Sequence, residues 1–119
     1  MEKINFNVAG VTFENRQRML ADIKYKTTGE RARRNWVFAR LVREPKNCYD
    51  KNAIKVLVYV STDKGKNYKW YPIGYVPREL AETLAPQLDA GSKAKDTKMA
   101  IVGGGFGRNL GCVIETTIA

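Results

Sequence analysis

The chain has 119 residues, 44% of them hydrophobic, which is enough for one folded domain with its own core and too little for two. Lys and Arg total 21 against 12 acidic residues, and the resulting net charge of +9 favours a polyanionic partner. Histidine is absent, which excludes nucleophilic sites and zinc sites that depend on it. No apolar run approaches the ~20 residues that a membrane-spanning helix needs.

The positive charge is concentrated in one part of the chain. Residues 16–46 hold ten cations and three anions, so most of the excess comes from about a quarter of the sequence. The two cysteines, Cys48 and Cys112, form no CxxC pair, and no secretory leader pattern precedes the first predicted strand. We therefore expect a cytoplasmic protein with reduced thiols, and no membrane association.

The first third of the chain predicts a strand and a short helix. Residues 4–8 alternate apolar with polar side chains, as in a half-buried strand, and Gly10 permits a bend after it. Asn15 can cap a helix over residues 16–23, whose buried face would carry Met19, Leu20 and Ile23. The basic stretch at residues 24–35 has no clear periodicity.

Further strands are predicted at residues 36–42, 53–60 and 68–76, rich in β-branched and aromatic side chains. Pro72 places part of the last of these at a sheet edge or a bulge. The clearest helix spans residues 76–91, with leucines at every fourth position, Gly91 as its stop and Pro86 as an expected kink or break. Residues 98–102 and 110–118 predict a closing pair of strands.

These elements are mostly short strands with two short helices and no βαβ alternation. The pattern predicts a mainly β, α+β fold: a small antiparallel β-barrel or sandwich in one domain, residues 1–119.

The loop between the second and third predicted strands is the strongest candidate for a ligand site. It places an aromatic, a carboxylate and several cations among the turn-forming residues Pro45, Asn47, Asp50 and Asn52. A buried aromatic is unusual in such a setting, so Tyr49 is better explained as a ligand contact. Asp50 and Asn52 could each hold the turn through side-chain-to-backbone bonds, and for Asn52 this is the better explanation.

Three blocks in this chain resemble the successive signatures of the HIRAN domain, in the same order. They are Val8-Ala-Gly-Val-Thr-Phe-Glu-Asn-Arg-Gln17, Arg43-Glu-Pro-Lys-Asn-Cys-Tyr-Asp-Lys-Asn-Ala-Ile-Lys-Val56 and Ile73-Gly-Tyr-Val-Pro-Arg-Glu-Leu-Ala81. The resemblance spans nearly the whole chain and suggests a stand-alone domain of bacterial or phage type. It implies a small OB-like β-barrel with two helices and capture of the 3′-hydroxyl end of single-stranded DNA, without catalysis or cofactors.

The resemblance also implies roles for individual residues. Tyr49 matches an aromatic that packs on the terminal nucleotide, Asp50 a carboxylate that accepts a hydrogen bond from the terminal hydroxyl, and Phe13 a second aromatic. Arg78 matches a phosphate contact. Thr12 and Tyr75 stand at phosphate-facing positions where the human family member has arginine and histidine, and Arg16 could compensate for the lost charge.

Bland alternatives stand beside these roles. Without the resemblance, Phe13 is better explained as a core aromatic, and Arg78 could pair with Glu82 one helical turn away. Trp36 and Trp70 are better explained as core or sheet-face residues than as stacking platforms. The glycine-rich segment 103–107 lacks the ending of a phosphate-binding loop and predicts a hairpin tip.

Three functions therefore compete on sequence grounds. The first is a non-catalytic module that binds single-stranded DNA ends, with a helicase or nuclease as candidate protein partner. The second is a protein-interaction barrel whose basic loop docks on an acidic or DNA-processing partner. The third is a nuclease using Asp50, Glu44 and a divalent ion, which the nearby Lys46, Lys51 and Lys55 disfavour.

Overall fold

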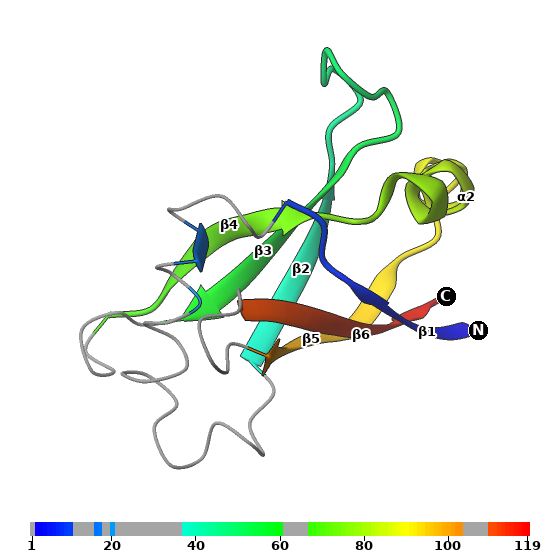
Figure 1. Cartoon of the computed structure of the whole chain (residues 1–119). Coiled ribbons are helices and arrows are strands. Elements are labelled where there is room, and N and C mark those ends of the chain that lie inside the picture. Colours follow the sequence, from blue (N-terminus) through cyan, green and yellow to red (C-terminus); the bar gives the residue numbers. More distant parts are fainter. Residues whose placement is uncertain (1, 11–15, 18–19, 21–36, 61–66, 104–109) are drawn as a thin grey trace.

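A computed structural model describes residues 2–10, 16–17, 20, 37–60, 67–103 and 110–119. Its elements are β1 (Glu2–Asn7), β2 (Val37–Arg43), β3 (Ile54–Val60), β4 (Lys69–Tyr75), α2 (Arg78–Asp89), β5 (Ala94–Gly103) and β6 (Leu110–Ile118). The strands form one antiparallel sheet in the order β1-β6-β5-β2-β3-β4 (Figure 1). The predicted mainly β class is confirmed, and each predicted strand is present within a few residues of its expected bounds.

The predicted closed barrel is not confirmed. β1 and β4 are the two edges of the sheet, and what joins them in the described part of the chain is an isolated antiparallel bridge between Ala9 and Tyr75. A ladder of several pairs would be needed to close the sheet into a barrel. The second predicted helix, α2, is present. The first falls mostly outside the described residues and is not confirmed, although Leu20 from its expected buried face is fully buried.

The hydrophobic core follows from alternation along the strands. In β3 the alternate residues Ile54, Val56, Val58 and Val60 are almost completely buried, and β6 shows the same two-residue period. Burying a valine or isoleucine side chain contributes roughly 1.5–3 kcal/mol, so one face of each strand drives the sheet to fold around this core.

A bulge in β4 explains why the sheet tolerates a proline there. Val56 pairs with Gly74 but the next residue, Leu57, pairs with Pro72, so Ile73 is the extra residue on β4. Because β4 is an edge strand, the missing N–H of Pro72 interrupts no central ladder. The prediction of an edge or a bulge at Pro72 is therefore confirmed on both counts.

Helix α2 is continuous through Pro86, so the predicted break is absent, while the alternative, a kink, stays a prediction. Pro86 lies in the last turns of the helix, where its missing N–H removes a hydrogen bond without dividing a long ladder. Leu84 is buried on the core face, and the helix ends before Gly91, which has φ +110° and donates its N–H to the Leu88 carbonyl at 3.2 Å. No described helix has the length and apolar character to cross a membrane.

Both cysteines are free thiols, Cys48 exposed and Cys112 buried. Burial raises the pKa of Cys112 to about 12, so this thiol remains protonated at neutral pH.

Gly74 is required by the close approach of the β1 segment to β4. A Cβ at this position would overlap the carbonyl oxygen of Ala9 and lie 2.6 Å from Cγ1 of Val8. Since both neighbours belong to the segment that forms the Ala9–Tyr75 bridge, the glycine is what allows the two sheet edges to meet.

We expect Gly74→Ala to lower the free energy of unfolding by about 1–3 kcal/mol, because the added methyl group overpacks this junction. Urea denaturation measures the change. Gly91→Ala is the matched control: Gly91 also has a positive φ, but an added Cβ there has no heavy atom within 4 Å. Gly74→Ala no more destabilising than Gly91→Ala would show that the junction can relax.

Candidate functional site

The loop of residues 44–53 joins β2 to β3 and projects from the end of the sheet (Figure 1). Its base is closed by a hydrogen bond from the Glu44 N–H to the Ala53 carbonyl, at 2.9 Å. Two turns shape its interior: the Asn47 N–H donates to the Glu44 carbonyl at 3.0 Å, and the Ala53 N–H donates to the Asp50 carbonyl at 3.1 Å. The loop is therefore held by its own backbone.

Two side chains complete the loop. Oδ1 of Asn47 accepts hydrogen bonds from the N–H groups of Tyr49 at 2.9 Å and Asp50 at 3.1 Å. Oδ1 of Asp50 accepts one from the N–H of Asn52 at 2.9 Å. The turn-holding side chains are thus Asn47 and Asp50, while Asn52, for which we predicted this role, contributes its backbone N–H.

Tyr49 presents its ring to solvent. Its exposed fraction is 88%, although its backbone N–H is fixed by Asn47, so the side chain stands on an ordered part of the loop. Two shallow hollows of about 530 Å³ and 650 Å³ flank the loop, and Tyr49 lines both of them. A structural role in the core is therefore excluded for Tyr49, and its ring is accessible to a planar ligand.

Asp50 lies between the loop and helix α2. Its second oxygen, Oδ2, is 3.9 Å from Nε of Arg78, the first residue of α2. The alternative pairing of Arg78 with Glu82 is not seen. The Arg78 side chain is 73% exposed and that of Asp50 only 21%, so the cation can move while the carboxylate stays in place.

The start of α2 adds free backbone donors beside Arg78. Pro77 occupies the cap position and makes no side-chain hydrogen bond to the helix, and the first helical bond runs from the Ala81 N–H to the Pro77 carbonyl at 2.9 Å. Uncapped N–H groups and the helix dipole both favour an anion at such an end. Arg78 and this helix terminus therefore form a positive region next to Asp50.

Glu44 holds this region together. On sequence grounds, Glu44 was named only as a metal ligand in the disfavoured nuclease hypothesis. Its carboxylate accepts hydrogen bonds from the Tyr75 hydroxyl at 2.9 Å and the Asn47 amide at 3.1 Å, and Nζ of Lys55 is 2.7 Å from it. The pKa of Glu44 is lowered, and the largest cause is its contact with Lys55. The hydrogen bonds from Asn47 and Tyr75 lower it further. A metal ion at this carboxylate would compete with Lys55 at Oε2 or with Asn47 and Tyr75 at Oε1.

Tyr75 connects the loop to the first sheet edge. Burial and then Glu44 raise the pKa of its phenol, so the hydroxyl remains protonated and donates to Glu44. The guanidinium of Arg16 lies 5.9 Å from the centre of the Tyr75 ring, and Nη1 of Arg16 donates to the Gly10 carbonyl at 2.7 Å. The role of Tyr75 at a phosphate stays a prediction; in this structure its hydroxyl donates to Glu44.

The structure brings five of the seven predicted site residues into one region. Asp50 approaches Arg78, Arg16 stacks on Tyr75, and Tyr49 and Tyr75 line the same hollow. Thr12 and Phe13 lie outside the described residues. Glu44 and Lys55, which the predicted set lacked, flank the loop in sequence, and an ion pair across the base of a hairpin is the signal that could have identified them.

The Glu44 network makes a prediction about pH. Because the pKa of Glu44 is lowered below its ordinary value of 4.5 in the folded protein, the unfolded chain binds more protons below that pH. The stabilisation from Glu44 is therefore present above about pH 4.5 and is lost as the pH falls further. We expect Glu44→Gln to lose roughly 1 kcal/mol of unfolding free energy near neutral pH and less near pH 3.

Urea denaturation of the wild type and of Glu44→Gln at both pH values measures this difference. If the difference in unfolding free energy between the two proteins is the same near pH 3 as near neutral pH, the stabilisation does not depend on the charge of Glu44.

The chain was compared with known families and proteins. The family model of the HIRAN domain matches residues 2–101. No curated protein and no solved structure gave a significant match. The matched segment includes the loop, Tyr75 and all of α2, and it covers most of the 119 residues. The chain is therefore a member of the HIRAN domain family.

Proposed function

We propose that this protein is a non-catalytic module that binds the ends of single-stranded DNA, with the 3′-hydroxyl terminus as its ligand. Membership of the HIRAN family is consistent with a DNA-binding module. The observation that carries the finer proposal is the arrangement of Tyr49, Asp50 and Arg78: the loop carries an exposed ring and a fixed carboxylate, and α2 places an exposed cation beside them.

The Tyr49 ring supplies the platform for the terminal base. Stacking on an aromatic side chain contributes ~1–3 kcal/mol per base and depends little on sequence, because every base has a π-face. Since Tyr49 is exposed and makes no core contact, the whole of its ring is available for this role. The expected ligand is therefore a strand end of any sequence.

Asp50 supplies the test for a free hydroxyl. Its Oδ1 is occupied by the Asn52 N–H, whereas Oδ2 faces Arg78 at 3.9 Å, too far for a strong hydrogen bond. A 3′-hydroxyl could donate to Oδ2, while a 3′-phosphate would meet a fixed negative charge. The carboxylate thus weakens binding of the wrong end as much as it favours the right one.

Arg78 and the start of α2 supply the phosphate contact. The guanidinium is exposed and only loosely paired, so it can turn to a phosphate without leaving a buried charge unpartnered. The free N–H groups of the helix terminus lie next to it. Catalysis would then belong to a separate partner, for which a helicase or a nuclease is the natural candidate.

Tyr49→Ala should weaken the binding of a 3′-hydroxyl strand by about 1–3 kcal/mol, because it removes the stacking platform. Fluorescence anisotropy with a labelled oligonucleotide measures the affinity. Thermal unfolding should be unchanged, since the side chain is exposed. Lys95→Gln, which removes an exposed cation on β5, is the control for non-specific effects. Unaltered affinity in Tyr49→Ala would remove stacking from the proposal.

Asp50→Asn tests end recognition itself. The asparagine keeps an oxygen for the Asn52 N–H and so preserves the turn, but it loses the negative charge. The wild type should prefer a 3′-hydroxyl end to a 3′-phosphate end by about tenfold or more, and Asp50→Asn should lose most of this preference.

The same anisotropy assay measures this preference. It is run with three strands: one with a 3′-hydroxyl, one with a 3′-phosphate and one whose only free end is 5′. Equal binding of all three strands by the wild type would contradict end recognition.

A further inference from the structure

A cluster of aromatic side chains lies on the outer face of β2, β3 and β4, away from the loop. Tyr59 packs between Trp70, at 5.1 Å between ring centres, and Tyr68, at 5.5 Å. Phe38 is 74% exposed, and the β2–β3 register, in which Ala39 faces Val58, continues to place Phe38 opposite Tyr59. The core side chains of these strands point to the other face, so this cluster is separate from the hydrophobic core.

A cation completes the aromatic cluster. The guanidinium of Arg40 lies 4.3 Å from the centre of the Trp70 ring, and Arg40 itself is exposed on β2. Exposed aromatic side chains interleaved with arginine on a sheet face are the arrangement on which single-stranded nucleic acids stack. A face that served only to keep the protein soluble would not place large rings in solvent.

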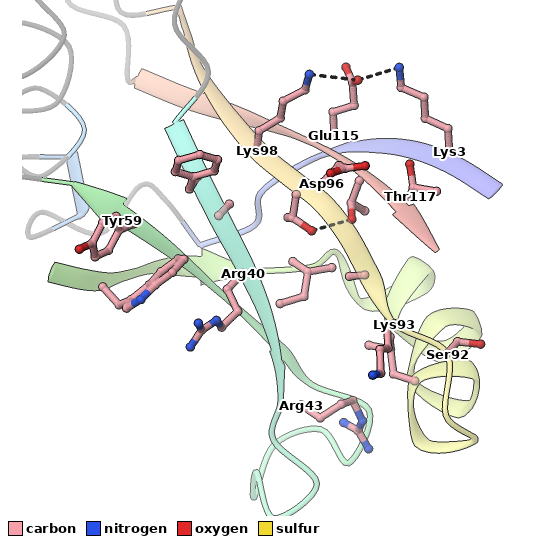
Figure 2. A pocket seen from close by; sticks show the side chains of 18 residues that line it. Lys3, Arg40, Arg43, Tyr59, Ser92, Lys93, Asp96, Lys98, Glu115 and Thr117 are labelled. Atoms are coloured by element: carbon pink, nitrogen blue, oxygen red, sulfur yellow. Dashed lines mark hydrogen bonds and ion pairs between the residues drawn. The ribbon is translucent and has the colours of Figure 1, made fainter. Parts of the chain in front are cut away.

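Phe38, Tyr59 and Trp70 of this cluster line one wall of an open groove of about 1180 Å³ that follows β2 (Figure 2). Its opposite wall comes from the start of β5, because β2 and β5 pair at Val37–Met99 and Phe38–Lys98 and then diverge. Five cations and two anions line the groove: Lys3, Arg40, Arg43, Lys93, Lys98, Asp96 and Glu115. Glu115 is paired with Lys3 at 2.8 Å and Lys98 at 3.8 Å, and Arg43 is paired with Asp89 of α2 at 2.9 Å. Five cations against these two acidic residues and Asp96 leave the groove positive overall.

The groove leads toward the end-binding loop. Arg43 lines it and also donates from Nη1 to the Ala53 carbonyl at 2.8 Å, at the base of that loop. The five residue steps from Phe38 to Arg43 extend about 17 Å along β2. The open shape and this length suit a polymer better than a small molecule, which is usually enclosed in a pocket of about 300–1,000 Å³.

We propose that this groove binds single-stranded nucleic acid along its length, with a base on the exposed ring of Phe38 and phosphates near Arg40 and Lys93. This inference rests on the proposed binding of single strands but not on end recognition by Asp50. A strand held at the loop would continue into the groove, so the domain would bind several nucleotides and not the last one alone.

The test compares strand lengths. Oligothymidylates of about 2 and about 10 nucleotides with a 3′-hydroxyl, and a circular single strand without ends, are titrated against the wild type, Phe38→Ala and Arg40→Gln. Tyr49→Ala serves as the reciprocal control from the loop, and Lys95→Gln, an exposed cation that does not line the groove, as the charge control.

Both groove variants should bind the longer strand and the circle about fivefold or more weakly than the wild type, and the dinucleotide equally well. For the longer strand, Arg40→Gln should also make the negative slope of log affinity against log salt concentration shallower by about 0.7, because one phosphate contact is lost. Tyr49→Ala should weaken the binding of both linear strands.

Groove variants that leave the length dependence and the circle affinity unchanged would overturn this proposal, and would leave end capture standing if Tyr49→Ala still weakens the dinucleotide. If the wild type shows no preference for a 3′-hydroxyl end and Phe38→Ala binds the longer strand weakly, end capture is overturned and the groove is supported.

Discussion

The bridge between Ala9 and Tyr75 is the contact on which the arrangement of the site depends. Its two backbone hydrogen bonds, at 2.8 and 3.0 Å, join the edges of a sheet that is not otherwise closed by the residues the structure describes. They are possible because Gly74 allows the two backbones to approach. As a result Tyr75, which comes just before α2, is fixed beside the loop, and Arg16 from the segment after β1 reaches its ring.

Most polar groups next to this junction are already paired within the protein. Glu44, Lys55 and the Tyr75 hydroxyl satisfy one another, and Asn47 holds the loop backbone. Among the described residues of the loop and of α2, accessible binding capacity remains on the ring of Tyr49, one oxygen of Asp50 and the guanidinium of Arg78, beside the exposed Lys46 and Lys51. The site offers a π-face, a hydrogen-bond acceptor and a cation close together. A nucleotide at the end of a strand could use all three, which is why we propose it as the ligand.

The sequence predicted much of this fold because its strands alternate strongly. The β3 pattern of buried valines and the placement of Pro72 at a bulge were readable from period and residue type. Closure was not, because whether edge strands meet depends on tertiary contacts such as the one at Gly74. The unbroken α2 shows the same limit, since the effect of Pro86 depends on how much helix follows it.

In the site, residue identity was more predictable than pairing. Tyr49 became a candidate from its position in a turn and Asp50 from the family resemblance. The partner of Tyr75 could not be predicted, because Glu44 lies 31 residues away in sequence and is brought near by the sheet.

Chemical-shift mapping on ¹⁵N-labelled protein tests the central claim most directly, using a dinucleotide with a free 3′-hydroxyl as the probe. The account predicts that the largest amide shifts fall on Tyr49, Asp50 and the first turn of α2, while β1 and β6 remain unchanged. Large shifts elsewhere on the molecule, with the loop silent, would contradict it.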